Sequence, residues 1–308
     1  MTLQQFEYIL AVNEFRHFGK AAEHCHVTQP TLSAMIQKLE EELGVKLFDR
    51  SVQPVCPTLI GQKIIAQAQT ILQLSHQITE FVAEEQDSVS GSLRLGILPT
   101  IAPYLLPRFY PQFCQSYPSL DIQVLEMKID QIEKALLQGE LDAALIATAP
   151  ESKKLRVDTL FYEEFFGYIA TSEALFKQDM IRSSDISGQN LWLLDEGHCF
   201  RDQLVKFCNL KGVQASRQAY RLGSMETFMR MVESGQGITL IPELALDQLN
   251  SCQQELVRPF AIPRPARQIR LLTHLDFIRQ SLLSKLKEAI LAAIPESMHT
   301  LKQTQYLV

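Results

Sequence analysis

The sequence predicts an α/β protein with an N-terminal winged helix-turn-helix, a long linker helix and a C-terminal α/β domain. Three observations predict this fold class: helical spacing of apolar residues up to residue 58, one long amphipathic stretch after it, and alternating strand and helix patterns from residue 89. The chain has 308 residues, enough for roughly two or three folding units. We therefore assign the helix-turn-helix to 1–58, the linker helix to 59–88 and the α/β domain to 89–308.

The bulk composition excludes several protein classes. Hydrophobic residues make up 46% of the chain, which is typical of packed cores and not of disordered or low-complexity proteins. No stretch is long and apolar enough to span a membrane, and Met1 to Glu7 lacks the basic start of a secretory signal. We therefore expect a cytoplasmic protein with reduced cysteines. The net charge of −6 argues against nucleic-acid binding by the whole chain, so any DNA-binding surface must be local.

Three short helices are predicted at the N-terminus. Thr2 to Phe15 reads as an amphipathic helix capped by Thr2, and Phe18 to His24 as a second, shorter helix. Thr28 is the predicted N-cap of a third helix, which tolerates Pro30 in its first turn and ends at Gly44. Residues 46–58 then predict a β-hairpin wing.

The third helix has a polar face of the kind that reads a DNA major groove. Its side chains there are short or forked polar groups that reach base edges and phosphates. The alternative is a small helical bundle with a solvated polar face. Residues 1–58 favour that alternative in one respect, because they hold seven acidic residues against five basic ones: Arg16, Lys20, Lys38, Lys46 and Arg50.

A long run of this region, "FGKAAEHCHVTQPTLSAMIQKLEEELGVKLFDR", resembles the helix-turn-helix of LysR-type transcriptional regulators nearly position by position. The resemblance implies double-stranded DNA as a partner and a backbone contact from Arg50 near the wing. It also implies that six residues lie on or beside the recognition helix: Thr28, Gln29, Pro30, Thr31, Ser33 and Lys38. The wing "SVQPVCPT" lacks the extra basic residues of many relatives, so we expect a shallow salt dependence of DNA binding.

The stretch after the wing predicts a helix that pairs with a second helix. Apolar or small residues recur at spacings of 4, 3, 4, 3 and 4, which is a heptad seam: Ile64, Ala68, Ile71, Ser75, Ile78 and Val82. The alternative is a core helix of a larger domain. In LysR-type proteins this helix dimerises, so the resemblance implies a homodimer or homotetramer whose geometry sets the half-site spacing on DNA.

Residues 89–308 predict a sensor domain. Strands over 92–98, 120–127 and 141–147 alternate with helices over 103–117 and 131–138, which predicts a parallel sheet. Ligands of such sheets bind at the carboxyl ends of strands, where Thr100 lies. Later strand patterns begin near Phe161, and the strand over 267–274 and the helix over 278–294 are expected to return to the first lobe.

Two sequence stretches, "LLQGELDAALI" and "MVESGQGITLIPELA", resemble parts of the effector domain of the same family. That domain has two lobes, like a periplasmic binding protein. The resemblance implies lobe I at about 89–161 and 268–308, and lobe II at about 162–267.

Two cysteines nine positions apart are the most informative pair in the chain. Phe200, Leu204 and Phe207 form one apolar stripe, which predicts a helix between Cys199 and Cys208. Nine helical residues span about 13 Å, whereas a disulfide needs Cα atoms within about 7 Å. A disulfide would therefore require this helix to unwind, which makes the segment a bistable switch.

The position of Cys199 at a helix N-terminus favours its thiolate, and His198 and Arg201 are nearby candidate cations. The alternative is that both cysteines only pack in a core. A zinc site is disfavoured because the spacing is irregular, so we expect no metal and no cofactor.

Three stretches resemble the hydrogen-peroxide sensors within the LysR-type family: "GHCFRDQLVKFC", "LPTIAPYLLP" and "LQQFEYILAVNEFRHFGKAAEHCHVTQPTLS". The resemblance implies that Cys199 reacts with peroxide and that Cys208 resolves the product into a disulfide. The other implied site residues are Thr100, which helps to hold peroxide, His198 and Asp202 beside the site, and Arg267, which supports the thiolate. Ile129 departs from the pattern, because the family usually has Thr there.

The resemblance implies an activator of oxidative-stress genes in a bacterial cytoplasm, with RNA polymerase as a further partner and no enzyme activity. One alternative is a metabolite-responsive regulator of the same family, with a small organic effector between the lobes near Thr100. A thiol peroxidase is a third hypothesis, which the helix-turn-helix disfavours.

Overall fold

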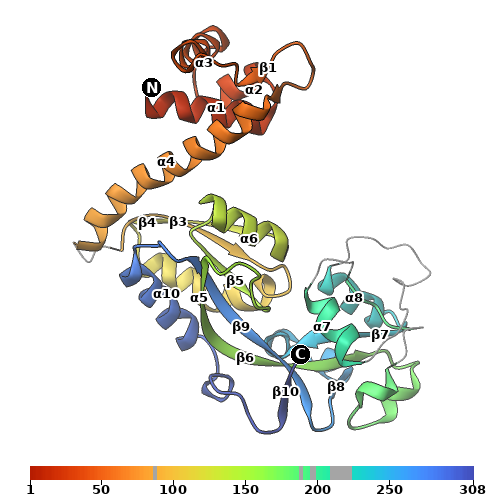
Figure 1. The fold of residues 1–308 in the computed structure, drawn as a ribbon. Helices are drawn as coiled ribbons and strands as arrows, with labels where there is room; N and C mark the ends of the chain where they lie inside the picture. Colours follow the sequence, from red (N-terminus) through yellow and green to blue (C-terminus); the bar gives the residue numbers. More distant parts are fainter. Residues whose placement is uncertain (86–88, 187–189, 195–198, 209–223) are drawn as a thin grey trace. The chain divides into compact units, whose positions relative to one another are not determined.

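The computed structural model describes residues 1–85, 89–186, 190–194, 199–208 and 224–308. The chain divides into two compact units, Met1–Gln86 and Asp87–Val308, and each is described by itself (Figure 1). Within the described ranges, no helix has both the length and the apolar character needed to cross a bilayer.

The first unit begins with the three predicted helices, α1 (Leu3–Phe15), α2 (Phe18–His24) and α3 (Gln29–Leu43). Thr2 caps α1 by accepting a hydrogen bond from the Gln5 backbone N–H at 3.3 Å. Thr28 caps α3, and Gly44 ends it at a φ of 68°, a left-handed conformation that costs glycine little. The three helices pack around one apolar core that includes Ile9, Val12, Leu32, Ile36 and Leu39.

The wing is confirmed as an antiparallel pair, β1 (Phe48–Asp49) and β2 (Cys56–Pro57), with strands of only two residues each. Helix α4 (Leu59–Glu85) follows it, and residues 86–88 of the predicted linker lie outside the described residues.

The predicted seam of α4 needs a correction. Ala68 and Leu72 are buried in the core of their own unit, together with Ile65. Among the side chains that the structure describes farther along the helix, the exposed large apolar ones are Ile71, Leu74, Ile78 and Phe81, at spacings of 3, 4 and 3. The side chain of Val82, the last residue of the predicted seam, lies outside the described residues. Apolar periodicity cannot distinguish a face that packs within the chain from one left open to a partner, and α4 has both.

The second unit starts with the predicted alternation: β3 (Gly91–Ile97), α5 (Ala102–Ser116), β4 (Leu120–Glu126), α6 (Ile129–Gln138) and β5 (Ala143–Ile146). These strands are parallel, in the order β4-β3-β5. The predicted parallel sheet is therefore confirmed for these three strands. Beyond them the sheet is mixed, because β9 (Arg264–His274) pairs antiparallel with β5, and the long β6 (Leu155–Ile169) pairs antiparallel with β9.

Strands β6 and β9 run through the whole unit, and the lobe boundaries expected near 161 and 267 fall inside them (Figure 1). The sheet continues as β4-β3-β5-β9-β6-β7, with β8 paired to β6 and β10 to β9. The remaining helices and strands are α7 (Cys199–Phe207), α8 (Met225–Glu233), β7 (Ile238–Pro242), α9 (Ser251–Gln254), β8 (Val257–Pro259), α10 (Gln280–Ala292) and β10 (Gln305–Leu307). Short 3₁₀ turns lie at Ala174–Lys177, Ser183–Asp185, Glu243–Gln248 and Glu296–Met298.

Candidate DNA-binding surface and redox site

Helix α3 presents most of the residues predicted to face DNA. Thr28, Gln29, Pro30, Thr31 and Lys38 are exposed, and Ser33 is half-buried. The Thr28 and Thr31 hydroxyls lie 2.8 Å apart, and Thr28 also caps the helix. The first turn of α3 is thus a fixed polar surface, the part of a recognition helix that contacts base edges.

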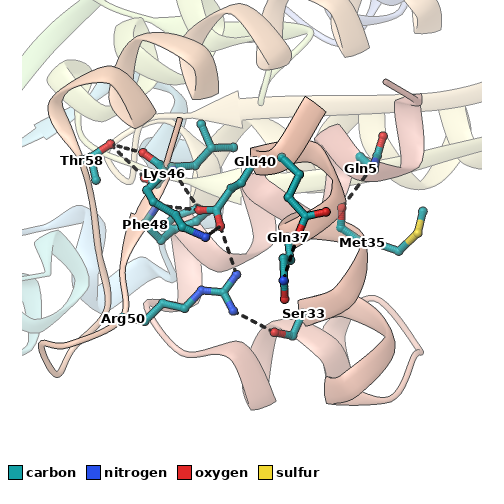
Figure 2. Close-up of polar contacts among 11 residues, drawn as sticks. Gln5, Ser33, Met35, Gln37, Glu40, Lys46, Phe48, Arg50 and Thr58 are labelled. Atoms are coloured by element: carbon teal, nitrogen blue, oxygen red, sulfur yellow. Dashed lines mark hydrogen bonds and ion pairs between the residues drawn. The ribbon is translucent and has the colours of Figure 1, made fainter. Parts of the chain in front are cut away.

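A buried carboxylate, Glu40, ties the recognition helix to the wing (Figure 2). Its Oε1 accepts hydrogen bonds from the backbone N–H groups of Leu47 at 2.8 Å and Phe48 at 3.4 Å. Its Oε2 lies 3.2 Å from Lys46 Nζ and 3.5 Å from Arg50 Nη2. Glu40 is not among the residues predicted from the sequence, because it is the first of three consecutive glutamates and only its helical phase marks it as buried.

Arg50, predicted to contact the DNA backbone near the wing, lies beside the recognition helix. It donates to Ser33 Oγ at 3.0 Å and pairs with Glu40 (Figure 2). Its guanidinium lies 4.7 Å from the centre of the Phe18 ring. These contacts orient Arg50 along α3. A contact between Arg50 and the DNA backbone remains a prediction.

The predicted helix between the two cysteines is confirmed. Helix α7 begins at Cys199, and the Cys208 backbone N–H still donates to the Leu204 carbonyl at 2.9 Å. Phe200 and Leu204 are buried in the core of the unit. Nine residues of continuous helix therefore separate the two Cα atoms by about 13 Å, beyond the reach of a disulfide. His198 and the side chain of Cys199 lie outside what the structure describes.

Cys208 is a free and buried thiol. Burial raises the pKa of the Cys208 thiol to about 12, because the charged thiolate would lose its hydration. At neutral pH this cysteine is protonated and a poor nucleophile. A first reaction with an oxidant at Cys208 is therefore disfavoured while α7 is intact.

Arg267 and Thr100, which are far apart in the sequence, are joined in the core. Arg267 on β9 is 1% exposed and donates to Thr100 Oγ1 at 3.1 Å and to the Thr100 carbonyl at 2.9 Å. Its Nε donates to Glu163 Oε2 at 2.8 Å, and Glu163 is the cross-strand partner of Arg267 on β6. Glu163 Oε1 also accepts from the Leu244 backbone N–H at 3.1 Å. All three groups are buried, so each hydrogen bond is made away from water.

The same arginine reaches the first turn of α7. Its guanidinium lies 5.4 Å from the centre of the Phe200 ring and 5.7 Å from that of Phe165, and the two rings meet edge to face. Phe200 directly follows Cys199. The Arg267 charge is thus fixed by Glu163 and Thr100 against the residue next to Cys199. Sequence reasoning missed Glu163, although a pair of glutamates within the apolar run "LFYEEFFGYI" is a signal of buried acid.

A cavity of about 940 Å³ lies between α6 and α7. Ile129 and Asp202, both predicted site residues, line it from the two helices, together with Gln203, Gln268 and Arg270. Arg201, predicted as a cation near Cys199, is buried on α7. Of the predicted site residues, Ile129 and Asp202 thus line the same cavity, and Thr100 and Arg267 are joined by hydrogen bonds.

Two family models match the chain. Residues 3–62 match the "Bacterial regulatory helix-turn-helix protein, lysR family" model, and residues 86–295 match the "LysR substrate binding domain" model. Together they match most of both units described above.

Among curated relatives, a "Hydrogen peroxide-inducible genes activator" of Dickeya chrysanthemi is 37% identical over 271 residues, 88% of each chain. The "DNA-binding transcriptional dual regulator OxyR" of Escherichia coli K12 is 35% identical over 292 residues, 95% of each chain.

Two solved structures are similar over most of their length. Full-length OxyR of Pseudomonas aeruginosa, in a variant form, is 34% identical with a TM-score of 0.76, covering 94% of this chain and 98% of that one. OxyR of Porphyromonas gingivalis is 50% identical with a TM-score of 0.67, covering 71% of this chain and 99% of that one. The chain therefore belongs to the LysR family of transcriptional regulators, within its OxyR group.

Proposed function

We propose that this chain is a hydrogen-peroxide sensor that regulates transcription through a Cys199–Cys208 disulfide. One observation carries the proposal: α7 runs unbroken from Cys199 to the last turn before Cys208, so the disulfide and the helix exclude each other. Oxidation is thereby converted into a change of fold. The names of the relatives, which refer to hydrogen peroxide-inducible genes, support the same signal.

The chemistry uses two steps. The Cys199 thiolate attacks one peroxide oxygen, the O–O bond breaks, and a sulfenic acid forms while the other oxygen leaves as hydroxide and takes a proton to become water. The Cys208 thiol then loses its proton and attacks the Cys199 sulfur, which forms the disulfide and releases the second oxygen as water. Two thiols are oxidised and one peroxide is reduced to two waters.

The surroundings of α7 suit this division of roles. A helix N-terminus and the Arg267 charge both favour a thiolate at Cys199, and we propose that the Thr100 hydroxyl, which accepts a hydrogen bond from Arg267, also hydrogen-bonds peroxide. His198 and Asp202 are proposed to complete the pocket. The buried Cys208 stays protonated, so it attacks the Cys199 sulfur only after α7 has unwound. Ile129 removes one hydroxyl from the cavity wall, so we expect fewer hydrogen bonds to bound peroxide or water there.

The output is a change in how two recognition helices meet DNA. We propose that Thr28, Gln29, Thr31 and Lys38 contact an operator, and that the exposed stripe Ile71, Leu74, Ile78 and Phe81 pairs α4 with a second copy. The assembly is a homodimer or homotetramer that acts with RNA polymerase in a bacterial cytoplasm, as a regulator and not as an enzyme.

Substitution of single cysteines tests the proposal. Full-length protein is given sub-stoichiometric peroxide, its disulfides are mapped by mass spectrometry, and transcription is measured from a peroxide-responsive promoter. Cys199→Ser is expected to abolish both disulfide and response, and Cys208→Ser to abolish the disulfide. Cys252→Ser, which removes an exposed thiol on α9, is the matched control and should change neither. A full response from Cys199→Ser would overturn the proposal.

The cavity of about 940 Å³ favours a second candidate function, a regulator that binds a small organic effector between α6 and α7. That function predicts activation that survives in Cys199→Ser and responds to an added metabolite. Repeated turnover of peroxide with thioredoxin as reductant would instead indicate a thiol peroxidase.

A further inference from the structure

Helix α7 contacts strand β10 and the residue that follows it. Gln203, on the second turn of α7, is 8% exposed and donates through Nε2 to two main-chain oxygens. One is Ala147, just after β5, at 3.0 Å, and the other is Val308, just after β10, at 3.2 Å. The Gln203 side-chain amide thus joins α7 to two separate segments of the chain.

Strand β10 is itself fixed in place (Figure 1). It pairs in parallel with the start of β9, and the Val308 backbone N–H donates to the Ala266 carbonyl at 3.1 Å. The Gln305 side chain donates to the buried Glu164 at 2.9 Å. The segment that contacts α7 is therefore part of the sheet.

The far end of α7 meets the same strand. The Phe207 ring lies 6.4 Å from the Tyr306 ring and 5.5 Å from the Phe260 ring, centre to centre. Gln203 and Phe207 are four residues apart, so they share one face of the helix. That face is attached to β10 at both positions, between the two cysteines.

We propose that Gln203 is a positioning residue which, with Tyr306 and β10, holds α7 helical and so sets the redox potential of the cysteine pair. These contacts need α7 to be a helix, whereas the disulfide needs it unwound. Their free energy therefore belongs to the dithiol state alone and opposes oxidation. Stabilisation of the dithiol form makes a disulfide more oxidising, so β10 raises the midpoint potential. This inference rests on the proposed disulfide switch.

The test measures the Cys199–Cys208 midpoint potential of the full-length protein in glutathione buffers. In each cycle, the protein dithiol gives two electrons and two protons to one oxidised glutathione, which becomes two reduced glutathiones. Gln203→Glu replaces the donor amide with a carboxylate oxygen that faces the main-chain oxygens of Ala147 and Val308. We expect the equilibrium to shift at least tenfold towards the disulfide, which is about 30 mV more negative.

Tyr306→Ala removes the ring contact with Phe207 and should shift the potential in the same direction, about threefold, or about 15 mV. Tyr306→Phe keeps the ring and is the matched control, with the potential of the unsubstituted protein. A role limited to general stability would lower the melting temperature of both redox forms and leave the potential unchanged.

The outcomes separate this inference from the proposed function. If the unsubstituted protein forms the disulfide and both Gln203→Glu and Tyr306→Ala keep its potential, the role of β10 is refuted while the switch stands. If no Cys199–Cys208 disulfide forms in the unsubstituted protein, the proposed function itself fails. A potential that becomes less negative in Gln203→Glu would also refute the positioning role.

Discussion

Glu163→Leu is the substitution whose cost follows most directly from the geometry. Glu163 is the ion-pair partner of Arg267, and both side chains are almost completely buried, at 2% and 1% exposed. The substitution leaves the guanidinium in the core with Thr100 as a neutral partner. A buried charge that loses its counter-charge is strongly destabilising, because desolvation is no longer offset.

The magnitude can be built from two contacts. The charge-assisted bond from Arg267 Nε to Glu163 is worth about 1.5–3 kcal/mol, and the Leu244 N–H, left buried without an acceptor, costs about 1–3 kcal/mol. The free energy of unfolding should therefore fall by about 3–5 kcal/mol, in line with broken buried ion pairs in general. For a unit of this size the melting temperature should fall by about 10 °C.

Urea unfolding of the full-length protein, followed by fluorescence and circular dichroism, measures this loss. Arg156→Ala is the matched control on the same strand, because its pair with Asp158 is half exposed and should cost at most about 1 kcal/mol. Glu163→Leu with Arg267→Leu removes both charges and should cost less than Glu163→Leu alone. A single-variant loss no larger than that of the control, or a double variant less stable than the single one, would show that Glu163 does not offset the buried Arg267 charge.

Three further predictions concern other parts of the chain. Because burial raises the pKa of Cys208 to about 12, its thiol should be alkylated about a thousandfold more slowly at pH 8 in the folded dithiol form than in urea. The same thiol has a lower pKa in the unfolded chain, so the free energy of unfolding should fall by about 1.4 kcal/mol per pH unit above pH 9. Cys208→Ala should abolish this fall. The salt dependence of DNA binding, measured by anisotropy titration, should be shallow. Glu40→Gln should steepen the slope of log affinity against log salt concentration by about 1, because Lys46 and Arg50 lose their carboxylate partner and can neutralise phosphate. An unchanged slope would contradict this prediction. Ile78→Asp places a charge in the exposed stripe of α4 and should yield monomers in light scattering, whereas Gln67→Asp on the same helix should not.

The sequence predicts those features that depend on neighbouring residues. The three N-terminal helices, their caps at Thr2 and Thr28 and the end at Gly44 follow from local spacing, and so does α7 between the cysteines. The incompatibility between the α7 helix and a Cys199–Cys208 disulfide follows from the length of that helix alone. These conclusions need only backbone geometry, which short-range patterns report well.

Contacts between distant segments were not predictable in the same way. Glu163 and Arg267 are 104 residues apart, and Gln203 and Val308 are 105 apart, and no local pattern joins them. The antiparallel crossing of β6 and β9 also depends on tertiary pairing that alternation does not report. On α4, the predicted seam mixed Ala68, which packs within the unit, with Ile71 and Ile78, which are exposed.

Hydrogen–deuterium exchange of the peptide that spans residues 199–208, combined with its intact mass, tests the switch most directly. Before peroxide, amides near the end of α7, such as that of Cys208, should be protected by the helix. After one equivalent of peroxide, we expect a loss of two hydrogens from the peptide that contains Cys199 and Cys208 and fast exchange throughout α7. A Cys199–Cys208 disulfide that forms while α7 keeps its protection would show that oxidation does not unwind the helix.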